Sequence, residues 1–97
     1  MLIKAGVDIS KLNKEIRRAL SPLESIYVSL GKELIITSTY EGTHMASSLH
    51  YHNDAIDIRW IPELAPKLIE KIKLRLGNDY DVVEETGHFH IEYDPKQ

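Results

Sequence analysis

The sequence of 97 residues contains no cysteine, so disulfide bridges and thiolate metal ligands are excluded. Any bound metal must therefore be held by His, Asp or Glu. Long hydrophobic runs are also missing, since no stretch approaches the ~20 apolar residues of a membrane-spanning helix. Neither sign of charge dominates, because the formal net charge is -3 and the acidic and basic residues are interspersed. We therefore expect neither a nucleic acid nor a membrane as a partner.

The length is that of one domain, residues 1–97, near the lower limit for a chain that buries its own core. Residues 1–8 lack a basic start followed by an apolar run of signal-peptide length. We expect a monomer that is made in the cytoplasm. Its final compartment is not predicted, and action on a cell wall would require release by another factor.

Apolar residues recur at helical spacing in two segments, residues 8–31 and residues 65–76. In the first segment, Asp8 or Ser10 is expected to cap the helix at its N-terminus. Pro22 is expected to interrupt or restart this helix, because proline lacks an amide donor. We interpret both helices as packing elements without chemistry of their own.

Short alternating or β-branched runs predict four strands, over residues 33–38, 55–60, 80–85 and 88–93. The last two strands form a predicted hairpin around Thr86-Gly87. The order helix, strand, strand, helix, strand, strand predicts an α+β fold with a small antiparallel sheet and helices packed on one side.

Strand alternation assigns the side chains of residues 55–60 to two faces. One face carries Ala55, Asp57 and Arg59, and the other carries Ile56, Ile58 and Trp60. An aspartate in the middle of such a strand is costly unless it is paired or ligates a metal. Asp57 is therefore a candidate site residue.

All five histidines lie between residues 43 and 91, and four of them form two short clusters, 50–52 and 88–90. In the last strand, His88, His90 and Glu92 share one face. Two imidazoles and one carboxylate from these segments can form a tetrahedral zinc site with the fourth position left for water. The spacing alone is equally consistent with structural histidines.

Two motifs carry a resemblance to a known family, namely Ser48-x-His50-x-x-x-x-Ala55-x-Asp57-Ile58 and His88-x-His90. Together they resemble the signature of the zinc D-alanyl-D-alanine carboxypeptidases, the L-alanyl-D-glutamate endopeptidases and the related Hedgehog N-terminal signalling domain. Local similarity to the Hedgehog domain extends to Ser48-Leu49-His50-Tyr51 and to the upstream His44. The resemblance covers residues 34–58 and 80–95.

The resemblance implies that one zinc ion is held by His50, Asp57 and His90. It implies a role for His88 beside the metal, in the outer shell or in the transition state. The general base would be Glu84, which fits the Hedgehog-like spacing, or Glu85, which fits the Glu-x-x-His variants. The implied function is a zinc-dependent metallopeptidase, of phage or bacterial origin, that hydrolyses peptide bonds in peptidoglycan stem peptides.

Two departures from the family pattern concern a turn and the substrate loop. Where the family usually has Gly after the first His, this chain has Asn53, which also tolerates a positive φ. The carboxypeptidases place a substrate-binding Arg in a loop where this chain has Glu41, and a glutamate would repel a terminal carboxylate. With His44 and Arg59, Glu41 makes up the candidate substrate-contacting set.

The departure at the substrate loop keeps several functions open. They are an endopeptidase, a peptidase with a different substrate, and a catalytically weak or inactive zinc-binding module that acts in binding or regulation. A structural metal domain is a further alternative, and a closed site in which His88 or His44 is a fourth ligand would support it.

Overall fold

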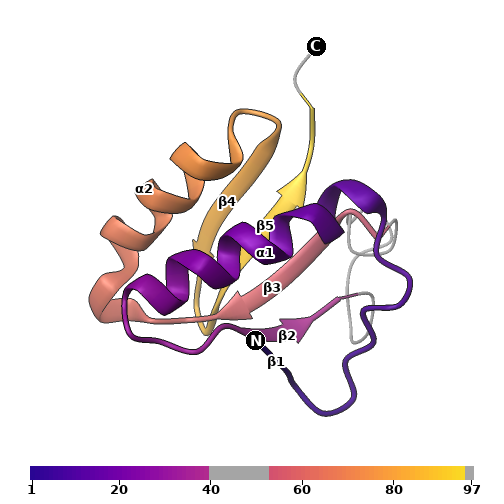
Figure 1. Cartoon of the computed structure of the whole chain (residues 1–97), viewed down its shortest axis with the longest axis horizontal. Coiled ribbons are helices and arrows are strands. Elements are labelled where there is room, and N and C mark those ends of the chain that lie inside the picture. The colour runs from indigo at the N-terminus through magenta and orange to yellow at the C-terminus, as the bar shows by residue number, and fades with distance from the viewer. Residues whose placement is uncertain (40–52, 96–97) are drawn as a thin grey trace.

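The computed structural model describes residues 1–39 and 53–95, and in these residues a five-stranded sheet is covered by two helices (Figure 1). The elements in chain order are β1 (Leu2–Ile3), α1 (Lys14–Ser29), β2 (Ile35–Ser38), β3 (Ala55–Arg59), the short 3-10 helix η1 (Pro62–Leu64), α2 (Ala65–Leu76), β4 (Tyr80–Glu85) and β5 (His88–Tyr93). The strand order within the sheet is β1-β2-β3-β5-β4. The α+β prediction is therefore confirmed.

The prediction of a wholly antiparallel sheet is wrong at one edge, because β1 pairs with β2 in parallel. Backbone bonds hold this edge: the amide of Leu2 donates to Leu34 at 2.8 Å and the amide of Lys4 to Ile36 at 2.9 Å. The side chains of β1 are largely exposed. Two residues without a buried face leave no alternation in the sequence, which is why this strand was not predicted.

Helix α1 begins later than expected and is not broken at Pro22. The side chain of Asp8 accepts from the amide of Ser10 at 2.8 Å, so it stabilises a turn that precedes the helix rather than its first turn. Asn13 occupies the N-cap position instead. The helix continues through Pro22 because its buried stripe packs against the core on both sides of that residue, through Ile16, Ala19, Leu20, Leu23 and Tyr27.

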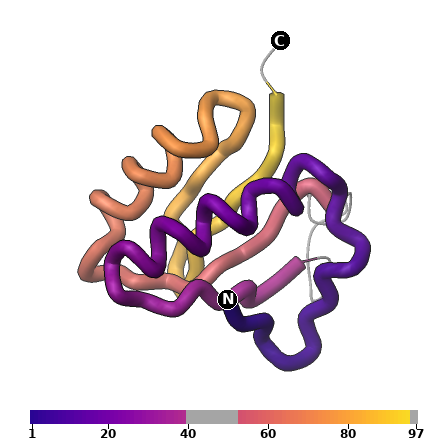
Figure 2. The backbone as a smooth tube through the Cα atoms, in the orientation of Figure 1, coloured from indigo at the N-terminus to yellow at the C-terminus, as the bar shows by residue number. Residues whose placement is uncertain are grey.

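Both helices lie on the same face of the sheet, with α1 across β3 and β5 and α2 beside β4 (Figures 1 and 2). The helix-facing side chains of β3 and β5 are fully buried, namely Ile56, Ile58, Phe89 and Ile91. Helix α2 contributes Leu68 and Ile72 to the same core. None of the described helices is long and apolar enough to cross a membrane.

The strand register decides which polar residues share the opposite face. Across β3 and β5, Asp57 pairs with His90 and Arg59 pairs with His88. Across β4 and β5, Glu85 pairs with His88. Because paired residues point to the same side of a sheet, these side chains all lie on the face turned away from the helices.

Asn53, two residues before β3, has a φ of +63°, so the left-handed backbone conformation expected at this position is confirmed. Its carbonyl accepts from the amide of Asn13 at 3.0 Å, which connects this turn to the start of α1. The turn thus helps to set where β3 begins, and with it the position of Asp57.

Two substitutions at this turn should differ in stability. We expect Asn53→Ala to have a free energy of unfolding about 1 kcal/mol lower than Asn53→Gly, because a β-carbon disfavours the left-handed conformation and glycine adopts it freely. Chemical denaturation of both variants measures the difference. Equal stability of the two variants would contradict the left-handed conformation at residue 53.

Candidate metal centre

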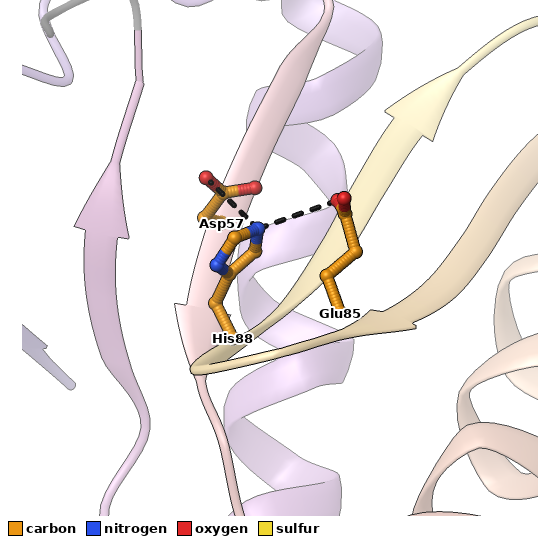
Figure 3. A group of neighbouring side chains, drawn as sticks. All are labelled: Asp57, Glu85 and His88. Atoms are coloured by element: carbon orange, nitrogen blue, oxygen red, sulfur yellow. Dashed lines mark hydrogen bonds and ion pairs between the residues drawn. The ribbon is translucent and has the colours of Figure 1, made fainter. Parts of the chain in front are cut away.

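Three neighbouring strands bring four titratable side chains together on the face away from the helices. Asp57 comes from β3, Glu85 from the end of β4, and His88 and His90 from β5. Figure 3 shows Asp57, Glu85 and His88 converging on this face, with α1 behind the strands. The spacing of two residues turns His88 and His90 to the same face of β5, and the strand register brings Asp57 and Glu85 beside them.

The donor atoms of the cluster lie at short range from one another. Nδ1 of His90 is 2.9 Å from Oδ1 of Asp57 and 3.9 Å from Oε1 of Glu85. Nε2 of His88 is 3.6 Å from Oδ2 of Asp57 and 3.3 Å from Oε1 of Glu85. Each imidazole therefore faces both carboxylates.

This spacing fits a zinc ion. Nitrogen and oxygen ligands bind zinc at ~2.0–2.1 Å, so two donors at tetrahedral angles lie about 3.3 Å apart. The four donor distances in the cluster, 2.9 to 3.9 Å, bracket that value. Imidazole and carboxylate are also the donor types that zinc accepts when no thiolate is present.

Asp57 is the most buried of the four side chains in the cluster. It is 6% exposed, whereas Glu85 is exposed and His88 is half-buried. A carboxylate removed from water destabilises the fold unless a positive charge, a hydrogen bond or a metal compensates it. The imidazole of His90 supplies such a hydrogen bond at 2.9 Å in the metal-free protein, and a cation would compensate the carboxylate more strongly.

Behind His90 lies a carboxylate to which the sequence analysis gave no role. Nε2 of His90 is 2.6 Å from Oε1 of Glu92, two residues further along the same face of β5. Histidines that bind metals commonly donate the N–H of their other nitrogen to a carboxylate in this way. The spacing of two residues between His90 and Glu92 predicted only that the two side chains share one face of the strand.

The two candidate bases lie on opposite faces of the sheet. Glu84 pairs with Phe89, a core residue, and its Oε2 accepts from Nε1 of Trp60 at 2.8 Å. Glu85 lies with the histidines instead. The sequence left both glutamates open, and the structure brings only Glu85 into the cluster.

The remaining predicted residues are not brought into the cluster by described contacts. Arg59 lies across from His88 in the register, but its Nη1 donates to the carbonyl of Glu33 at 3.2 Å. The predicted metal ligand His50 and the candidate substrate residues Glu41 and His44 lie outside the described residues.

A second ligand set is also compatible with the geometry. Within residues 1–39 and 53–95, Asp57, Glu85 and His88 each offer one ligand atom, and these three atoms lie within 4.8 Å of one another. This set includes Glu85 and His88, which the resemblance implies as catalytic groups, and omits His90. It describes a more closed site, in which Glu85 is a ligand and not a base.

The pKa of His90 is raised above its ordinary value of 6.5. Burial lowers this pKa, but the hydrogen bonds to Asp57 and Glu92, together with the charges of both carboxylates, raise it by more. In the metal-free protein, His90 is thus an imidazolium held between two carboxylates over a wider pH range than a free histidine.

No family model matches the chain, and no curated protein matches it either. Support for a function therefore comes from the residues of the cluster and from the resemblance of the two motifs.

The raised pKa of His90 predicts a pH-dependent stability in the metal-free protein. The contribution of the imidazolium is complete below the unfolded-state pKa of about 6.5 and is lost as the pH rises through the higher folded-state pKa. In the presence of a chelator, we expect His90→Gln to lower the free energy of unfolding by more at pH 6 than at pH 9. Denaturant titrations of both proteins at the two pH values test this, and an equal or larger loss at pH 9 would contradict it.

Proposed function

We propose that this chain is a zinc-dependent metallopeptidase of the type found in the D-alanyl-D-alanine peptidases and the Hedgehog domain. The observation that carries the proposal is the pairing of Asp57 with His90 across two strands, with Glu85 and His88 within 4 Å of the pair. A metal site next to a carboxylate and an imidazole that are not themselves ligands is an arrangement that can support hydrolysis.

In this proposal, Asp57 and His90 hold the metal from neighbouring strands, and His50 is the third ligand. The short distance between Asp57 and His90 and the carboxylate of Glu92 behind the imidazole support these two ligands. His50 is assigned on the resemblance of its motif alone. The bound zinc would supply Lewis acidity and a water with a pKa of about 7.

The proposed catalytic roles follow from where the other two side chains lie. Glu85 is exposed and lies within 3.9 Å of both imidazoles, so its carboxylate can take a proton from water and pass it to the leaving amine. His88 is half-buried and points its Nε2 toward the same space. An imidazole there can donate a hydrogen bond to the oxyanion that forms from the scissile carbonyl.

The proposed substrate is a peptide bond in a peptidoglycan stem peptide, as the motif resemblance implies. The substrate-binding arginine of the carboxypeptidases has no counterpart in the loop that contains Glu41. A site without that cation does not select a terminal carboxylate, so cleavage within the peptide is favoured over removal of its last residue.

A second candidate function is a zinc-binding module that does not hydrolyse peptides. The compact set of Asp57, Glu85 and His88 favours this alternative, because a base that ligates the metal cannot also take up a proton. Such a module would bind zinc tightly and act by recognising a partner.

The two neighbouring glutamates give a matched test of the base. We expect zinc-loaded Glu85→Gln to release amines from peptidoglycan about 10²–10⁴-fold more slowly than the wild type, because it cannot take up a proton. Glu84→Gln should stay within a few-fold of wild type, because Glu84 lies on the other face beside Trp60. Metal content is measured for each protein.

The outcomes of this test separate the two functions. Loss of hydrolysis with zinc retained in Glu85→Gln supports the peptidase. Loss of zinc itself supports the closed site, in which Glu85 is a ligand. A zinc-loaded wild type that releases no amines would reject the peptidase, and a larger effect of Glu84→Gln would reject Glu85 as the base.

Removal of the Asp57 charge should weaken zinc binding. We expect Asp57→Asn to lose more affinity than the ~10–100-fold typical of an outer-shell residue, because a direct ligand is changed. Asp79→Asn, in the exposed turn before β4, is the control and should bind like the wild type. Competition with a chromophoric chelator measures each affinity, and one zinc per chain at unchanged affinity in Asp57→Asn would show that Asp57 is not a ligand.

A further inference from the structure

The imidazole of His90 is held at both of its nitrogen atoms. Nδ1 faces Asp57 at 2.9 Å, and Nε2 faces Glu92 at 2.6 Å. The Glu92 side chain is largely buried, at 23% exposed, and comes from the same strand two residues away. The ring is thus fixed between a carboxylate of β3 and a carboxylate of β5.

A neutral histidine carries one proton, and the nitrogen without it is the one that can bind a metal. In this site the side of the ring that faces Asp57, Glu85 and the proposed metal is Nδ1. The proton must then reside on Nε2, where a carboxylate at hydrogen-bond distance is the strongest acceptor available.

We propose that Glu92 is a positioning residue that keeps the His90 proton on Nε2 and thereby directs Nδ1 to the metal. This inference rests on the zinc site of the proposed function, but it is independent of whether the site hydrolyses peptides. Glu92 acts through His90 and does not ligate the ion, because its carboxylate lies beyond the ring nitrogen that faces away from Asp57.

The neighbouring acidic residues provide a matched control. Asp81 pairs with Glu92 across β4 and β5, and ligand atoms of Asp81, Glu92 and Asp94 lie within 4.8 Å of one another. Asp81→Asn therefore removes the same charge from the same region of the sheet without changing the acceptor of His90. A purely long-range effect of charge on the metal would appear in both variants.

The experiment measures zinc affinity by chelator competition in the full chain. We expect Glu92→Ala to bind zinc about 10–100-fold more weakly than the wild type, and Asp81→Asn to bind within about 3-fold of it. Glu92→Gln should recover part of the loss, because an amide oxygen still accepts from Nε2–H. Hydrogen–nitrogen correlation spectra of the histidine rings should show the His90 proton on Nε2 in the zinc-loaded wild type and Glu92→Gln.

The results separate this inference from the proposed function. Equal affinities of Glu92→Ala and wild type, equal losses in Glu92→Ala and Asp81→Asn, or a His90 proton on Nδ1 would each overturn the role of Glu92. Zinc binding that depends on Glu92 in a protein without peptidase activity would support the role of Glu92 and reject hydrolysis. A wild type that takes up no zinc would overturn both.

Discussion

The antiparallel register between β3 and β5 sets Asp57 directly opposite His90, and the rest of the candidate site depends on this pairing. A shift of one residue would turn every side chain of β3 to the other face, so that Asp57 would enter the core and Ile58 would face the polar cluster. The buried partners of the correct register, Ile58 and Phe89, oppose such a shift. Hydrophobic burial on one face therefore fixes the geometry of the polar cluster on the other.

The same division of faces explains how a chain of this size tolerates a nearly buried carboxylate. The free energy required to bury Asp57 is offset locally by its hydrogen bond to the imidazole of His90 at 2.9 Å. The helices remain on the apolar side, where α1 and α2 cover the core without reaching the cluster. The apolar core and the polar cluster therefore lie on opposite faces of a single sheet.

Periodicity in the sequence was sufficient for the elements that carry the cluster. Asp57, His88 and His90 alternate with buried apolar residues, so their shared face could be predicted from a spacing of two. The bounds of α2, β4 and β5 followed from an apolar stripe and from the Thr86-Gly87 turn in the same way.

The features that were missed depend on hydrogen bonds and strand register, which composition and periodicity do not show. Strand β1 is held by backbone bonds to β2, which leave no mark on its side chains. Helix α1 begins at Lys14 rather than near Asp8, because the side chain of Asp8 accepts from the amide of Ser10 in a turn that precedes the helix. The choice between Glu84 and Glu85 required the hairpin register, since two adjacent glutamates are equivalent in composition and differ only in the face to which the pairing assigns them.

The two-residue connection between β4 and β5 makes the cluster sensitive to insertions near the turn. Because Glu85 and His88 are the last pair before Thr86 and Gly87, the number of residues in the turn determines which glutamate lies over the histidines. One inserted residue that is absorbed as a bulge in β4 would exchange the faces of Glu84 and Glu85. With two adjacent glutamates at the end of β4, a carboxylate would lie on the histidine face both before and after such an insertion.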